Sequence, residues 1–106
     1  MLPKNIISTI LKHGTIVWHK HALERMMRRG INKKTVVTIL LSGEIIKYYT
    51  DDKPYPSYLF FGRVDNEPYH IVAAFDAEQK TGFIITAYQP DLKHFQNDYK
   101  TRKNEK

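Results

Sequence analysis

Apolar residues in the first 42 positions recur at helical spacing, with polar residues between them. This spacing predicts helices over residues 3–13, 19–29 and about 33–42, with the short extended segment TIVW between the first two. Gly30 follows the second helix as a C-terminal stop, and Asn32 is a favourable N-cap for the third. The first and third helices are expected to bury their apolar positions, which are Ile6, Ile7, Ile10 and Leu11 in one and Val36, Val37, Ile39, Leu40 and Leu41 in the other.

From Glu44 onward, the pattern is typical of strands separated by turns, the first of which is DDKPYP with its two prolines. Helices followed by a meander of strands indicate an α+β fold, with N-terminal helices packed on a four-stranded antiparallel sheet. We expect one domain over residues 1–98 and a frayed, polar, basic tail over residues 99–106. The four predicted strands cover residues 44–50, 57–64, 67–76 and 82–88.

The composition indicates a small cytoplasmic protein with an affinity for polyanions. The 106 residues include no cysteine, no apolar N-terminal signal segment and no apolar run of the ~18 residues that a membrane span needs. Lysine and arginine number 17 against 11 aspartate and glutamate, for a net charge of +6, and 12% of residues are aromatic. This combination favours a nucleic acid as partner. The alternative interpretation is that the positive charge serves only to keep the protein soluble.

The second predicted helix separates cations from apolar residues. Two interpretations of its cationic side remain open: a solvated face, with Glu24 paired to Arg28 for about 0.3–0.5 kcal/mol, or one wall of a cleft. A metal site at His19 and His21 is disfavoured because imidazoles two positions apart on a helix diverge, and we expect no cofactor. On the apolar side lie Ala22, Leu23, Met26 and Met27, which we expect to be buried, and on the other lie His21, Arg25, Arg28 and Arg29.

Three polar residues interrupt otherwise apolar strands: His70 in YHIVAAF, and Thr86 and Tyr88 in FIITAY. Opposed residues of an antiparallel pair share a face of the sheet. His70 therefore joins the other two only if it lies opposite Thr86 or Tyr88, which requires an odd-numbered loop or a β-bulge between these strands. Gly82 is well placed for such a bulge. A lone strand histidine with a structural role is the alternative interpretation.

Motifs in a fixed order resemble a bacterial family of small stand-alone domains of unknown function: HALERMMRRGI, SGEIIKYYTDDKPYPSYLFFG, PYHIVAAF and IITAYQPD. The resemblance runs from about Trp18 to Phe95. That family is similar in turn to the barnase–EndoU–colicin–RelE ribonuclease superfold, which includes toxin nucleases and messenger-RNA interferases. The family's polar pattern falls on His21, Arg25, His70, Thr86 and Tyr88.

This resemblance implies a metal-independent, toxin-like endoribonuclease. His21 and His70 would be the general acid and base, in either order, for attack of a ribose 2′-OH on the adjacent phosphate. Arg25 would hold that phosphate, and Thr86 and Tyr88 would orient it through their hydroxyl groups. The cations expected to follow the RNA backbone are Lys20, Arg28, Arg29 and Arg63.

Two other classes of function fit the same residues. A non-catalytic module would dock RNA, DNA or a ribosome on this basic face, and Arg25→Ala or Arg28→Ala would then weaken a salt-dependent affinity. A protein-interaction domain, such as a toxin component held by an antitoxin or an immunity-type element, would pair with its partner along a sheet edge or across the groove. The sequence leaves these alternatives open because a phosphate-binding face serves each of them.

Overall fold

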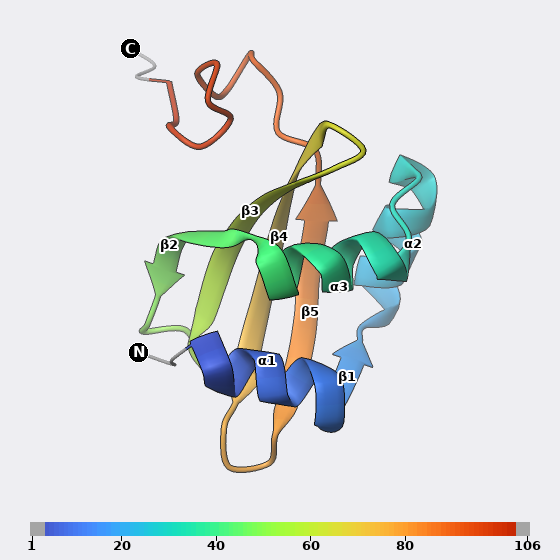
Figure 1. The fold of residues 1–106 in the computed structure, drawn as a ribbon, viewed down its shortest axis with the longest axis vertical. Coiled ribbons are helices and arrows are strands. Elements are labelled where there is room, and N and C mark those ends of the chain that lie inside the picture. Colours follow the sequence, from blue (N-terminus) through green and yellow to red (C-terminus); the bar gives the residue numbers. More distant parts are fainter. Residues whose placement is uncertain (1–3, 104–106) are drawn as a thin grey trace.

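The computed structural model describes residues 4–103, which form three helices and five strands in an α+β fold. Figure 1 shows α1 and α3 crossing one face of the sheet, while α2 stands beside β5. The strand order across the sheet is β1-β5-β4-β3-β2. The elements are α1 (Lys4–His13), β1 (Thr15–Trp18), α2 (Lys20–Arg29), α3 (Lys33–Ser42), β2 (Glu44–Tyr49), β3 (Ser57–Val64), β4 (Glu67–Asp76) and β5 (Thr81–Tyr88).

The sheet is five-stranded and mixed, so the predicted four-stranded antiparallel sheet is wrong by one strand. The segment TIVW, which forms β1, pairs in parallel with β5 from Thr15 opposite Thr81 to Trp18 opposite Ile84. The four predicted strands pair antiparallel. Four residues between two helices are too few to show the alternation of a strand, and their partner lies far along the chain. The local pattern therefore gives no signal for this pairing.

Residues with special backbone geometry set the ends of several elements. Gly30 ends α2 in the left-handed conformation (φ 68°), and the Asn32 side chain caps α3 by accepting the Thr35 backbone N–H at 2.8 Å, which confirms both predictions. Asp65 and Asn66 have positive φ and form the two-residue turn between β3 and β4. None of the helices within residues 4–103 is long and apolar enough to cross a membrane.

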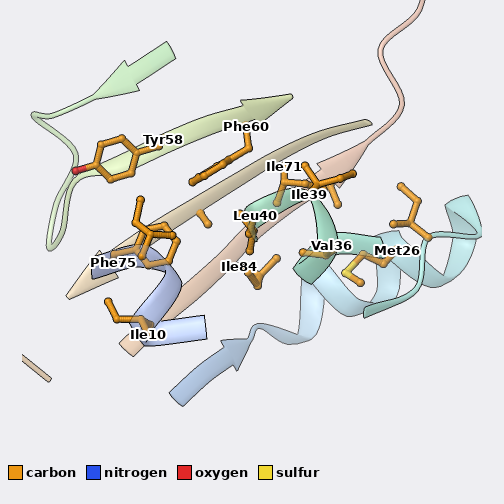
Figure 2. Close-up of a cluster of buried hydrophobic side chains, with 14 residues drawn as sticks. Ile10, Met26, Val36, Ile39, Leu40, Tyr58, Phe60, Ile71, Phe75 and Ile84 are labelled. Carbon is orange, nitrogen blue, oxygen red and sulfur yellow. The ribbon is translucent and has the colours of Figure 1, made fainter. Parts of the chain in front are cut away.

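The core fills the space between the sheet and helices α1 and α3 (Figure 2). The predicted burial of Met27 and Leu41 is wrong, because these side chains are 82% and 37% exposed. α2 stands beside the sheet rather than across it, so only a narrow stripe, Ala22 and Met26, is buried. The fully buried side chains include Ile7, Ile10, Val36, Ile39, Leu40, Tyr58, Phe60, Ile71 and Ile84.

We call the side of the sheet that faces away from α1 and α3 the outer face. The chain after β5, residues 89–103, folds back over part of this face and is called the C-terminal segment. Its Phe95 packs edge-on against His70 of β4, with ring centroids 4.8 Å apart. The guanidinium of Arg63, from β3, lies over the ring of Tyr99 at 5.4 Å. Aromatic contacts thus attach the segment to the sheet.

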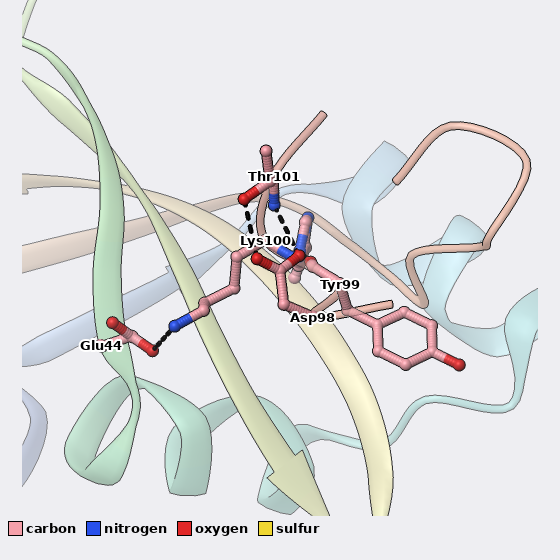
Figure 3. A network of polar contacts seen from close by, with 6 residues as sticks. Glu44, Asp98, Tyr99, Lys100 and Thr101 are labelled. Carbon is pink, nitrogen blue, oxygen red and sulfur yellow. Dashed lines mark hydrogen bonds and ion pairs between the residues drawn. The ribbon is translucent and has the colours of Figure 1, made fainter. Parts of the chain in front are cut away.

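Hydrogen bonds close the end of the C-terminal segment on itself (Figure 3). The carboxylate of Asp98 accepts the backbone N–H groups of Thr101 and Lys100, both at 2.9 Å, and these bonds lower the pKa of the carboxyl to about 2. Lys100 forms an ion pair with Glu44 of β2 at 3.0 Å. These contacts include residues 99–101 of the predicted tail, and residues 104–106 of that tail lie outside the described residues.

Candidate nucleic-acid interface

A β-bulge places the polar residues of β4 and β5 on one face. His70 lies opposite Tyr88, and Val72 lies opposite Thr86, but Ala73 then pairs with Ile84, so Ile85 is the extra residue. The four-residue loop before β5 starts the pairing in the register that would put His70 and Tyr88 on opposite faces. The bulge shifts the pairing by one residue and brings them to the same face. The expected shared face is confirmed, whereas the bulge forms at Ile85 rather than at Gly82.

His70 is fully buried on the outer face, with both ring nitrogens engaged. Its Nε2 lies 2.6 Å from the carbonyl oxygen of Tyr99, and its Nδ1 lies 3.1 Å from the Tyr88 hydroxyl. Burial lowers the pKa of His70, and the bond to the Tyr99 carbonyl opposes this effect. Since a carbonyl only accepts, Nε2 carries the proton of the neutral ring, and the Tyr88 hydroxyl donates to Nδ1. Neither nitrogen is free to exchange a proton with a ligand.

The Tyr88 hydroxyl connects this buried histidine to the surface. Burial raises the pKa of Tyr88, and the charge of Tyr49 adds to the increase, while the positive charges of Arg102 and Arg29 act in the opposite direction. Two arginines from distant parts of the chain therefore act on one hydroxyl. Because the Tyr88 hydroxyl donates its proton to His70, its oxygen can only accept a hydrogen bond from other groups.

Arg29 reaches this region because β1 is short. β1 ends where Trp18 pairs with Ile84, so within the described residues β5 has no neighbouring strand beyond that point on this side. The Arg29 guanidinium, from the last turn of α2, donates through Nη1 to the carbonyl oxygen of Ala87 at 2.8 Å. This bond satisfies an edge carbonyl and anchors the guanidinium, whose remaining N–H groups can bind an anion.

Two adjoining hollows surround Tyr88. One, of about 490 Å³, is lined by Arg29, Tyr88, Gln89 and Asp91. The other, of about 270 Å³, shares the last three of these residues and also reaches His94 and Arg102. We call the two hollows together the Tyr88 groove. Its ends are cationic, with one arginine from α2 and one from the C-terminal segment.

The side chains of Asp91 and His94 form a hydrogen bond at the wall of the Tyr88 groove. The His94 Nδ1 lies 3.0 Å from the Asp91 carboxylate, which also accepts the backbone N–H groups of Lys93 and His94 at 3.0 and 2.9 Å. The bond from the His94 backbone is the largest cause of the lowered pKa of Asp91. The carboxylate therefore fixes Nδ1–H as the donor and leaves Nε2 to act as an acceptor or base, and the His94 side chain is 45% exposed.

The other predicted residues come from α2, β3 and β5. His21, Arg25 and Arg29 follow one side of α2 at four-residue spacing, and His21 is about 12 Å along the helix axis from Arg29. Among the described residues, the hydrogen bonds and ring contacts of His70 come from the sheet and the C-terminal segment, and none of them involves His21 or another residue of α2. Exposed on the surface are His21, Arg25, Lys20, Arg28 and Arg63, while Thr86 is half-buried on the outer face.

Sequence reasoning missed Asp91, His94 and Arg102. Asp91 is part of the YQPD motif, and a histidine three residues after an aspartate is a signal for a local pair, but nothing in the sequence shows that the chain turns back toward Tyr88. The return depends on the bridge between Phe95 and Arg102 and on the bond from the Lys103 backbone to His94. Within residues 4–103, no three His, Cys, Asp or Glu side chains gather as a metal site would require.

Comparison with known families identifies the chain by its central region. Residues 18–89, from the end of β1 through β5, match the domain of unknown function DUF4258. The chain belongs to the DUF4258 family. No curated protein and no solved structure matches it. The DUF4258 match includes His21, Arg29, His70 and Tyr88, and it ends before the Asp91–His94 pair.

Proposed function

We propose that this DUF4258 protein binds single-stranded RNA by its phosphates in the Tyr88 groove. The observation that carries the proposal is the placement of Arg29 and Arg102 at the two ends of this groove, around one hydroxyl. Arginine matches phosphate geometry with paired N–H donors, and a net charge of +6 favours encounter with a polyanion. The exposed cations of α2, Lys20, Arg25 and Arg28, extend the surface that the RNA backbone would follow.

The proposed reaction is cleavage of the bound chain without a metal ion. His94, oriented by Asp91, would take the proton of a ribose 2′-OH through Nε2, and the 2′ oxygen would attack the adjacent phosphorus. The bond from phosphorus to the 5′ oxygen would break, and that oxygen would take a proton from water, leaving a 2′,3′-cyclic phosphate and a 5′-OH. The burial of His70 favours His94 for this role, because an acid or base must reach the substrate. RNA is proposed as the substrate because the sequence motifs led us to expect a similarity between this family and the ribonuclease superfold.

The same burial also favours a second candidate, a non-catalytic RNA-binding module. With both nitrogens of His70 occupied, the groove contains one accessible imidazole, that of His94, rather than an acid–base pair. Binding by arginines and α2 cations does not depend on either histidine. The two candidates share a surface and differ in whether the RNA is cut.

Purified protein incubated with a labelled single-stranded RNA in EDTA tests both candidates. The ribonuclease proposal expects products that end in 2′,3′-cyclic phosphate, and it expects His94→Gln to abolish them while His13→Gln, in another exposed histidine, has no effect. Binding without products would favour the non-catalytic module. Absence of binding at low ionic strength would contradict both.

A further inference from the structure

A separate hollow on the outer face lies near the start of α2, whereas the Tyr88 groove lies near the end of that helix. It has a volume of about 310 Å³, at the lower end of the ~300–1,000 Å³ typical of small-molecule sites, and its lining is mostly apolar. We call it the aromatic pocket. The residues that shape it include His19, Asp52, Lys53, Tyr55, Phe83 and Ile85.

Three rings in the aromatic pocket are nearly parallel. Tyr55 stacks on Phe83 with centroids 5.4 Å apart and planes at 8°, and His19 lies on Phe83 at 6.2 Å and 15°. The Asp76 carboxylate, by hydrogen bonding to the hydroxyl of Tyr55, is the largest cause of the raised pKa of Tyr55. Parallel, pre-positioned rings present flat faces to a planar ligand, and unpaired nucleobases bind proteins by this kind of stacking.

The aromatic pocket and the Tyr88 groove lie on the same face of the sheet. Phe83 is opposite Ala74, and Tyr88 is opposite His70, so both project from the outer face of β5. At about 3.3 Å per strand residue, the two positions are roughly 16 Å apart. α2 spans the same interval, with His19 just before its first residue and Arg29 at its end (Figure 1).

We propose that the aromatic pocket binds an unpaired base of the RNA whose phosphates occupy the Tyr88 groove. The proposal rests on the proposed function and adds a second contact to it. Between the two contacts, the exposed side of α2 offers Lys20, His21 and Arg25 to the phosphates of a few nucleotides. Lys53 at the pocket supplies a further cation for the base or its phosphate.

Fluorescence anisotropy with two labelled hexanucleotides tests the proposal. One is a 2′-O-methyl RNA, which lacks the 2′-OH that cleavage requires, and the other has the same backbone with abasic sugars. Phe83→Leu removes the central ring and keeps an apolar side chain, and we expect it to weaken binding of the first hexanucleotide about 5- to 150-fold. Binding of the abasic hexanucleotide should be unchanged, because it has no base to stack.

His19→Ala provides a second variant, since His19 is exposed and its side chain makes no capping hydrogen bond to α2. The matched control is Tyr48→Leu, which removes a ring that is 47% exposed on the helix-covered side of the sheet. Thermal unfolding of each variant verifies that it is folded. We expect His19→Ala to lower affinity for the base-containing hexanucleotide and Tyr48→Leu to leave it unchanged.

The outcomes separate this proposal from the proposed function. If Arg102→Gln weakens binding and the folded pocket variants do not, the aromatic pocket is not a base site, while the Tyr88 groove keeps its role. If the pocket variants weaken binding and Arg102→Gln does not, the base site stands and the groove proposal falls. Equal losses for both hexanucleotides would overturn base stacking, and failure of the wild-type protein to bind either would overturn both proposals.

Discussion

The imidazole of His70 and the hydroxyl of Tyr88 face each other across β4 and β5 at 3.1 Å, at a point that the C-terminal segment covers. The pair links a fully buried ring to a hydroxyl at the surface of the Tyr88 groove. It depends on the bulge at Ile85, because the unbulged register would turn His70 and Tyr88 to opposite faces. His70, which the sequence predicts to be catalytic, thus contacts both Tyr88 of the groove and the C-terminal segment.

Acidification should destabilise the protein through His70. Burial lowers the pKa of His70 in the folded state, so below the unfolded value of about 6.5 the unfolded chain binds a proton that the folded one does not. The free energy of unfolding should therefore fall from pH 7.5 to pH 5.5, by at most about 1.4 kcal/mol per pH unit for this group. Urea unfolding of His70→Phe should show a smaller dependence, whereas His21→Gln, which removes an exposed histidine, should keep the wild-type slope.

Tyr88→Phe should destabilise the fold by about 1–3 kcal/mol, because it leaves Nδ1 of the buried His70 without a donor. Urea denaturation measures the change. Tyr48→Phe, at a residue that is 47% exposed, is the matched control and should change stability by less than about 0.5 kcal/mol. Equal stability of Tyr88→Phe and the wild-type protein would show that the hydrogen bond between Tyr88 and His70 contributes nothing.

Arg102→Gln should weaken RNA binding and reduce its salt dependence. Loss of one phosphate contact lowers the slope of log K against log salt by about 0.7 for a single strand. Lys12→Gln makes the same change in net charge at the end of α1, away from the Tyr88 groove, and should leave the slope unchanged. Titrations at several salt concentrations distinguish the two variants, and identical slopes would contradict a phosphate contact at Arg102.

Asp91→Asn should slow RNA cleavage while His94→Gln abolishes it, with both variants still binding RNA. General acid–base groups typically contribute about 10²–10⁴-fold to a rate, and the carboxylate acts through the orientation of His94. Single-turnover rates of the two variants and the wild-type protein, measured at one pH, give the size of each effect. Cleavage by His94→Gln at the wild-type rate would remove this residue from the mechanism.

The sequence predicted elements whose pattern is local and missed those that depend on distant contacts. β3 and β4 match their predicted ranges because alternation and the Asp65–Asn66 turn define them. The segment of β1 was expected only to be extended, and its pairing was missed because its partner, β5, is remote in the chain. The side of α2 that carries Met27 was expected to be buried, but Met27 is exposed because α2 lies at the edge of the sheet. The spacing of apolar residues within a helix does not show where that helix packs.

For the candidate site, the shared face of His70, Thr86 and Tyr88 could be predicted because only a few strand registers put these three residues together. The segment that covers this face could not be predicted from the sequence. The polar composition of residues 99–106 predicts a frayed tail, and nothing in it indicates that Lys100 and Thr101 bond to Asp98 or that the preceding Phe95 packs on His70. The position of His94 beside Tyr88 depends on that structure and cannot be obtained from spacing alone.

The parallel pairing of β1 with β5 also bears on how the protein forms in the cell. Because an early segment of the chain completes its edge of the sheet only against the fifth strand, a ribosome must synthesise most of the chain before that edge can assemble. Closing so long a loop is entropically costly and slows folding. A nascent chain released before β5 would leave one edge of β4 without its neighbouring strand. Premature termination should therefore yield a target for chaperones and proteases rather than a folded domain.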